Sequence, residues 1–73
     1  KSSAIIINAA NEIFVDEFLR NNINFNDIVN YLKLVLKDKN YIKTSNLSTG
    51  SVNNIYAIDS WARKTALKII EKK

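Results

Sequence analysis

Hydrophobic residues near the start of the chain recur at the spacing of an α-helix from about residue 3 to residue 20. At 100° per residue they form one broad apolar face, made of Ile6, Ile7, Ala10, Ile13, Phe14 and Phe18. The opposite side is not cleanly polar, because Ile5, Val15 and Leu19 lie there among asparagines and carboxylates. A helix that is apolar on both sides normally has protein on both sides, so we expect part of this surface to be covered.

Two further segments show helical spacing, each with a single apolar stripe. They are residues 27–39 and residues 52–71. The first stripe consists of Ile28, Tyr31, Leu32, Val35 and Leu36, and the second of Val52, Ile55, Ile58, Ala62, Ala66 and Ile69. The residues between the two segments, 40–50, are rich in Ser, Thr and Asn and are predicted to form a polar connection.

Helix ends can be placed by residues that satisfy unpaired backbone groups. Ser2 or Ser3, Asn26 and Ser51 are the predicted N-terminal caps, since their side-chain oxygens can accept a hydrogen bond from the first turn. Arg20, Asn21 and Asn22 are predicted to end the first helix, because Asn tolerates the left-handed conformation found there. The chain has no proline, a single glycine and no alternation of period two. The prediction is an all-α fold in which three amphipathic helices form most of a four-helix-bundle-like domain.

Composition limits what so small a domain can do. A chain of 73 residues buries only about 60% of the surface that its unfolded form exposes, so it depends on packing or association. It has no Cys and no His, which excludes disulfides, Cys-containing zinc sites and the commonest general base. Its longest apolar run, residues 4–7, is far shorter than the roughly 20 residues needed to cross a bilayer, so no membrane partner is expected.

The net charge of +4 is a weak indication of nucleic-acid binding. Lys64, Lys68, Lys72 and Lys73 gather at the end of the last predicted helix, where the helix dipole favours cations anyway. We therefore expect no nucleic-acid partner. The alternative function is an independent basic helical module that binds nucleic acid or a protein partner, and salt-sensitive binding would identify it.

Carboxylates are the main remaining candidates for acid–base or metal chemistry. Glu12 and Asp16 lie one helical turn apart, and together with Asp59 they could bind a divalent cation in a small metal-dependent enzyme. Two neighbouring carboxylates rarely make a cage, so we interpret Glu12 and Asp16 as solvated or interface-facing. Asp59 and Arg63 are predicted to form an ion pair at i, i+4. No catalytic, cofactor-binding or metal-binding residue is predicted.

Two asparagines in the interior of the first predicted helix favour a docking role. Asn is a mediocre helix former, and the amide of Asn8 or Asn11 offers two donors and an acceptor to a neighbouring backbone. Both share a face with Val15 and Leu19. The predicted interdomain docking residues are Asn8, Asn11, Glu12, Val15 and Leu19.

Three motifs follow one another at compatible spacing and cover essentially the whole chain. They are Asn8-Ala9-Ala10-Asn11-Glu12 with the apolar helix after it, Ile23-Asn24-Phe25-Asn26-Asp27-Ile28, and Ile58-Asp59-Ser60-Trp61-Ala62-Arg63. Together they resemble the C-terminal helical domain of the 1-deoxy-D-xylulose 5-phosphate reductoisomerase family. Asp16 and Glu17 depart from the small residues that members of this family often carry at these positions.

The resemblance implies a non-catalytic domain, residues 1–73, that buttresses the catalytic domain of the same polypeptide. It implies that three of the four bundle helices lie in this chain and that the nucleotide-binding and catalytic domains lie outside it. The family's full enzyme uses NADPH and a divalent cation, Mg or Mn, to make 2-C-methyl-D-erythritol 4-phosphate for the non-mevalonate isoprenoid pathway. No cofactor is expected in the fragment, which could self-associate, whereas the parent is expected to be a homodimer. Its expected location is cytoplasmic if bacterial, or a plastid-like organelle if eukaryotic.

Overall fold

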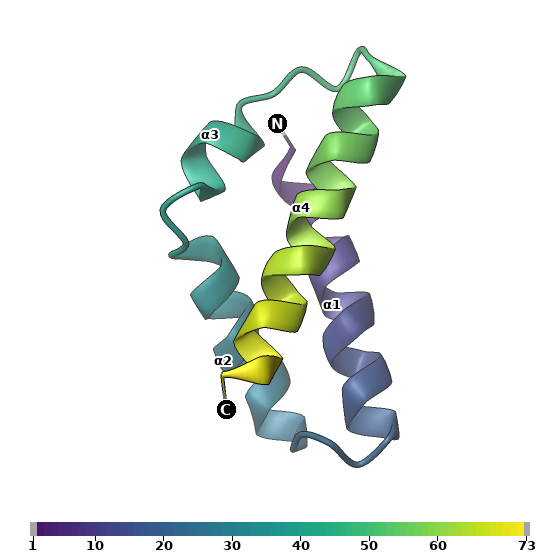
Figure 1. Ribbon diagram of the computed structural model, residues 1–73, viewed down its shortest axis with the longest axis vertical. Coiled ribbons are helices and arrows are strands. Elements are labelled where there is room, and N and C mark those ends of the chain that lie inside the picture. Colours follow the sequence, from purple (N-terminus) through teal and green to yellow (C-terminus); the bar gives the residue numbers. More distant parts are fainter. Residues whose placement is uncertain (1, 73) are drawn as a thin grey trace.

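The computed structural model describes residues 2–72, which fold into helices (Figure 1). Three helices are long: α1 (Ser3–Leu19), α2 (Phe25–Leu36) and α4 (Val52–Glu71). A short helix, α3 (Tyr41–Ser45), lies between α2 and α4. No strand occurs among the described residues, so the all-α prediction is confirmed. Lys73, the last of the predicted lysine cluster, lies outside these residues.

The three long helices lie side by side along the longest axis of a molecule that measures 37 × 21 × 17 Å (Figure 1). α1 and α4 run in the same direction, and α2 runs the opposite way beside them (Figure 1). α1 makes its most extensive contacts with α4. Small residues favour this close approach, because Ala9 and Ala10 of α1 and Ala62 and Ala66 of α4 are all buried.

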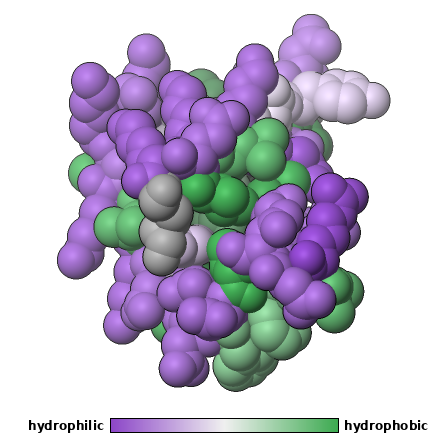
Figure 2. Space-filling model, turned by 60° about the horizontal axis from the view of Figure 1, so that its bottom comes forward, coloured by the Kyte–Doolittle hydropathy of each residue, from purple (hydrophilic) through white to green (hydrophobic). Residues whose placement is uncertain are grey.

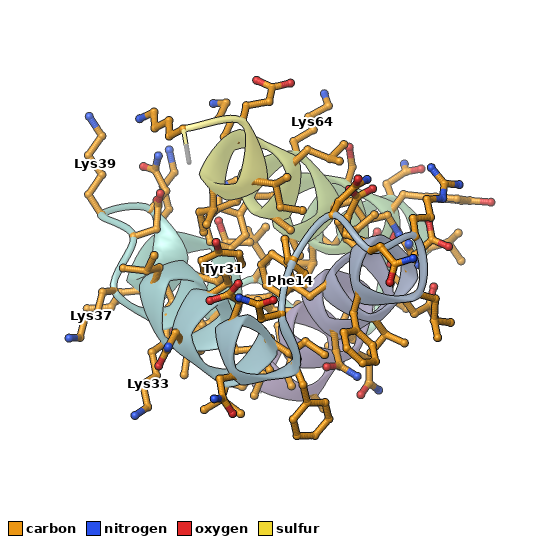
Figure 3. All side chains as sticks on the ribbon, turned by 90° about the horizontal axis from the view of Figure 1, so that it is seen from below. Phe14, Tyr31, Lys33, Lys37, Lys39 and Lys64 are labelled. Carbon is orange, nitrogen blue, oxygen red and sulfur yellow. The ribbon has the colours of Figure 1, made fainter. Side chains whose placement is uncertain are left out.

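The core is formed by one buried stripe from each long helix. Phe14 is fully buried and meets Tyr31 edge to face, with ring centroids 5.5 Å apart (Figure 3). The buried hydrophobic residues are Ile6, Ala9, Ala10, Phe14, Ile23, Ile28, Tyr31, Val35, Ile58, Ala62 and Ala66. The stripes predicted from spacing are wider than those that are buried, since Ile7, Leu36, Val52 and Ile55 are exposed. Each long helix has only two long neighbours, so the flanks of its apolar face remain open to water.

The turn after α1 confirms the predicted C-terminal cap. Asn21 is left-handed, with φ of 65°. Its backbone N–H donates to the Phe18 carbonyl at 3.0 Å, and the Asn22 N–H donates to the Glu17 carbonyl at 2.9 Å. This pair of hydrogen bonds is the Schellman motif. It reverses the chain so that α2 can pack antiparallel to α1.

The predicted cap of α2 is wrong. The helix begins at Phe25 and its capping residue is Asn24, not Asn26. The backbone N–H of Asn24 donates to Asp27 Oδ2 at 2.9 Å. The carboxylate of Asp27, in the first turn of α2, thus satisfies the backbone N–H of the capping residue. At the other end α2 stops at Leu36 rather than near residue 39. By contrast, the Ser51 cap of α4 is confirmed, since its hydroxyl oxygen accepts the Asn54 N–H at 3.4 Å.

The segment predicted to be a polar connection contains α3, which binds the start of α1. The Ser2 hydroxyl donates to the Leu47 carbonyl at 2.9 Å, and the Ser2 N–H donates to the Ser45 carbonyl at 3.2 Å. The Ser3 and Tyr41 hydroxyls lie 2.6 Å apart. The prediction that Ser2 or Ser3 caps α1 through its side chain is therefore wrong. These hydroxyls hold residues 41–47 against the end of the bundle.

Candidate docking surface

The residues predicted to dock against another part of the protein lie together on α1. Asn8 and Glu12 are exposed, Asn11 and Val15 are half-buried, and Leu19 is 71% exposed. Neither amide side chain of Asn8 and Asn11 hydrogen-bonds another residue within the described part of the chain. Their donors and acceptors are therefore not used by hydrogen bonds within these residues.

An arginine of α4 joins this surface to its neighbouring helix. Arg63 Nη2 donates to Glu12 Oε1 at 2.9 Å, and Arg63 Nε donates to Asp59 Oδ2 at 2.9 Å. The hydrogen bond to Asp59, followed by that to Glu12, raises the pKa of Arg63 above its already high ordinary value. The predicted Asp59–Arg63 pair is confirmed. The contact with Glu12, 51 residues away in sequence, was not predicted.

Two hollows lie along the groove between α1 and α4, which we call the α1/α4 groove. The larger has a volume of about 480 Å³, and four of the five predicted docking residues line it. Its lining residues are Asn11, Glu12, Ile13, Val15, Asp16, Leu19 and Arg63. The smaller, of about 280 Å³, is lined by Ile5, Val52, Ile55, Tyr56 and Asp59. Because Arg63 binds Glu12 and Asp59, the charged bridge lies where the two hollows meet.

The α4 side of this groove was missed by sequence reasoning. Val52 was assigned to the buried stripe but is 70% exposed, and Tyr56 is 72% exposed. The sequence offered one signal that these residues are exposed: both lie in the first turns of a helix, where a neighbouring helix need not cover them. Large exposed apolar side chains gathered at a hollow are typical of a surface that contacts another protein.

The carboxylates of the groove do not fit a metal centre. Glu12 and Asp59 both bind Arg63, and Asp16 pairs with Arg20 at 3.2 Å. Among residues 2–72, no group of three or more acidic, His or Cys side chains is placed to hold a metal ion.

A second apolar surface lies where α1 and α2 meet, away from the α1/α4 groove. Phe25 is 68% exposed and packs edge to face on Phe18, with ring centroids 5.7 Å apart. Val29, Leu36 and Ile7 are also exposed. Figure 2 shows hydrophobic side chains reaching the surface among polar ones, in a view from the end that carries the turn between α1 and α2. We call the exposed residues Ile7, Phe25, Val29 and Leu36 the α1/α2 stripe.

The lysines have a different distribution from the acidic groups of the groove. Lys33, Lys37, Lys39 and Lys64 point outward from α2, the turn after it and α4 (Figure 3). No lysine in the described range forms an ion pair. None of the helices formed by residues 2–72 is long and apolar enough to span a membrane.

Comparison with known proteins gives one consistent result. A sequence model described as the DXP reductoisomerase C-terminal domain matches residues 1–65. A 1-deoxy-D-xylulose 5-phosphate reductoisomerase of Ehrlichia canis is 42% identical over 71 residues, which are 97% of this chain and 17% of the relative. One of Prosthecochloris aestuarii is 41% identical over 61 residues, covering 84% of this chain and 15% of the relative. The chain thus spans about a sixth of the length of these relatives. No solved structure matches it.

Proposed function

The chain belongs to the DXP reductoisomerase C-terminal domain family, and from that membership we propose that it is the helical buttress of a longer reductoisomerase. In this proposal the longer polypeptide converts 1-deoxy-D-xylulose 5-phosphate to 2-C-methyl-D-erythritol 4-phosphate with NADPH and Mg or Mn. Its other domains supply all of that chemistry. The enzyme is proposed to be a cytoplasmic homodimer that serves non-mevalonate isoprenoid biosynthesis.

The observation that carries the structural role is the α1/α4 groove. Two hollows there combine exposed apolar side chains with amides that form no hydrogen bond among the described residues and a charged bridge. Protein interfaces likewise combine apolar contacts with polar groups that hydrogen-bond across the contact. We propose that the catalytic domain of the same polypeptide covers the groove. Because the two domains share one chain, a contact of modest area is enough to hold them together.

The chemistry of the chain's own residues supports a non-catalytic role. Neither His nor Cys occurs in the sequence, so the commonest general base and the thiol nucleophile are missing. Three of its carboxylates, Glu12, Asp16 and Asp59, form ion pairs with arginines. Side chains arranged in this way hold helices together and form contacts, and they offer no poised acid or base.

The α1/α2 stripe is the site that we propose for the fourth long helix of the bundle. The stripe runs along two antiparallel helices, and Phe25, Val29 and Leu36 follow one another at helical spacing on α2. Exposed residues with that spacing are the usual contacts of a packed helix. With this stripe and the α1/α4 groove both covered, α1 is enclosed on two sides, as its apolar pattern indicates.

The test of the buttress uses the full-length polypeptide that carries this chain. Leu19→Asp places a charge in the larger hollow, so docking should weaken and the thermal stability of the enzyme should fall, while turnover at low temperature is retained. Leu34→Asp is the matched control, because Leu34 is also exposed but lies on α2, outside both hollows. Equal melting temperatures for the two variants would contradict the proposal. The isolated chain carrying Leu19→Asp should fold normally, which separates docking from folding.

A further inference from the structure

We propose that the lysine-bearing faces of α2 and α4 bind an acidic segment of a separate partner protein. We call this region the α2/α4 lysine surface and define it by two groups of exposed residues: Lys33, Leu34 and Lys37 at the end of α2, and Lys64, Leu67 and Lys68 on α4. None of these residues belongs to the α1/α4 groove or to the α1/α2 stripe. The inference therefore adds an interaction that the proposed buttress does not require.

The lysines of this surface lie on neighbouring turns of two helices that pack against each other. Lys33 lies in the last turn of α2, and Lys37, its C-terminal capping residue, follows four residues later. Lys64 and Lys68 have the same spacing on α4. Residues four apart share a helix face, about 6 Å apart along the axis. Figure 3 shows Lys33, Lys37 and Lys64 pointing away from the core and from α1.

The charges of residues 2–72 are divided between two sides of the bundle. On α1 and around the groove, four carboxylates exceed two arginines, so this side is acidic. In the rest of the described range, seven lysines exceed the three carboxylates Asp27, Asp38 and Glu71. Asp27 and Asp38 each accept a backbone N–H beside a helix end. Since no lysine in this range forms an ion pair, the lysine charges are available to a partner.

Two lysines four residues apart repel each other and oppose the helix that carries them. The helix dipole favours a cation at Lys37, which caps α2, but the effect of the dipole falls off within the last turn. The dipole therefore does not account for Lys64, which lies about two turns before the end of α4. Carboxylates of a bound partner would remove the repulsion within each pair, and this favours binding.

An exposed leucine accompanies each pair of lysines. Leu34 lies between Lys33 and Lys37 in sequence, and Leu67 precedes Lys68. Each leucine is roughly half exposed. Protein interfaces combine apolar contacts with polar and charged ones. The partner segment should therefore carry apolar residues that cover the leucines, among Asp or Glu residues that reach the lysines.

The residue types favour the carboxylates of a protein over phosphates or lipid. Arginine, with its planar fork of donors, is the preferred side chain for nucleic-acid phosphates. The two arginines of the sequence, Arg20 and Arg63, are both engaged with carboxylates away from this surface. Helices that lie in a membrane surface bury a whole apolar face, whereas Leu34 and Leu67 are already half covered by the bundle.

A separate protein is the occupant that is compatible with the other surfaces of the domain. This choice rests on the proposed function, in which the remainder of the same polypeptide covers both sides of α1. The α2/α4 lysine surface points away from α1 (Figure 3), so it stays open to a partner. A second copy of the same surface is disfavoured, because a two-fold contact would bring lysines against lysines.

The experiment measures binding of a defined acidic peptide to the full-length polypeptide that carries this chain. The probe is a fluorescent peptide of repeated Glu-Glu-Leu-Glu units, and its fluorescence anisotropy reports binding at low salt. A peptide with Gln in place of Glu, an oligothymidylate of equal charge and vesicles containing phosphatidylserine are compared with it. We expect the Glu peptide to bind, the Gln peptide not to bind, and added salt to weaken binding by screening exposed charges.

Two double variants with the same change in net charge locate the surface. Lys37→Gln combined with Lys64→Gln should weaken peptide binding roughly fivefold, because two exposed ion pairs are lost. Lys39→Gln combined with Lys43→Gln is the matched control and should have much less effect, since these lysines lie in the turn after α2 and in α3. Leu34→Ser should also weaken binding, through loss of an apolar contact. All of these side chains are exposed, so each variant should fold.

Each other outcome overturns the inference or a stated part of it. Absence of binding by the Glu peptide at low salt would reject the surface. Equal losses from the two double variants would show that net charge alone attracts the peptide. Tighter binding of the oligothymidylate would identify a nucleic acid as the partner, and binding to vesicles alone would identify a membrane. The buttress is tested separately by the stability of the Leu19→Asp enzyme without peptide, so the two failures are distinguishable.

Discussion

Phe14 of α1 and Tyr31 of α2 meet edge to face at an interplanar angle of 61°. Phe14 is fully buried, and the same side chain lies in the core shared with α4. The contact therefore joins the antiparallel pair α1 and α2 at the centre of the bundle. Edge-to-face pairs of this kind contribute about 0.5–1.5 kcal/mol beyond the burial of their area.

Phe14→Ala should remove most of the stability of the isolated domain. The loss from emptying such a site is about 3–5 kcal/mol, whereas a domain of this size has on the order of 4–11 kcal/mol in total. Urea denaturation followed by circular dichroism measures the change. Phe25→Ala is the control, because Phe25 is largely exposed and its loss should cost much less. Equal losses would show that Phe14 is not central to the core.

Ser2→Ala should loosen the contact between α3 and the start of α1. Ser2 is fully buried, and its hydroxyl donates to the Leu47 carbonyl. Removing the hydroxyl leaves that carbonyl without this donor, at a cost of about 1–3 kcal/mol. Hydrogen exchange should quicken in residues 41–47 before it changes in the long helices. The exposed Ser60→Ala serves as the reference, and a similar effect from it would refute the prediction.

Asp27→Ala should destabilise α2, whereas Asn26→Ala should not. Asp27 accepts the Asn24 N–H and lies in the first turn, where the helix dipole favours a negative charge. Loss of the cap costs about 0.5–2 kcal/mol. Asn26 is exposed and forms no side-chain hydrogen bond with the rest of residues 2–72. Thermal unfolding of both variants measures the loss of stability. A larger loss from Asn26→Ala than from Asp27→Ala would show that Asn26 is the cap of α2.

Arg63→Ala should lower stability modestly, in a way that depends on salt. Exposed ion pairs contribute about 0.2–1 kcal/mol each, and Arg63 makes two. Melting temperatures compared at low and high salt should differ most at low salt, because salt screens exposed charges. Since the pKa of Arg63 is raised, its charge is constant around neutral pH and this loss should not vary there. Lys64→Ala, which removes an adjacent unpaired cation, should have little effect.

The long helices could be predicted because their signals are local. Residues three and four apart share a face whatever the rest of the molecule does, so the spacing predicted helices near α1 and α4 and the pair Asp59 and Arg63. The Asn21 turn and the Ser51 cap are local in the same sense. α2 was placed two residues late because Phe25, although apolar, begins a helix in which it is not buried.

The missed features depend on contacts between distant residues. α3 has five residues, too few to show a period. It is held in place by the hydrogen bonds that residues 2 and 3 form with residues 41, 45 and 47. The bond between Arg63 and Glu12 joins residues that no sequence rule relates. The α1 half of the docking surface was predicted from polar residues inside an apolar helix. The α4 half of the docking surface was not predicted. Spacing shows in which direction an apolar face points, but it does not show which part of that face a neighbouring helix covers.

The chain crosses the length of the molecule three times, once in each long helix. Because three is an odd number, the two ends of the described chain lie at opposite ends of the bundle. Ser2 is beside α3, and the last turn of α4 ends near the turn between α1 and α2 (Figure 1). Tension applied between these ends is directed along the helix axes and tends to slide α1 past its neighbours. The first bonds to carry that load are those of Ser2 to residues 45 and 47, followed by the tie from Arg63 to Glu12. These hydrogen bonds and this ion pair therefore resist sliding of the helices along the length of the bundle.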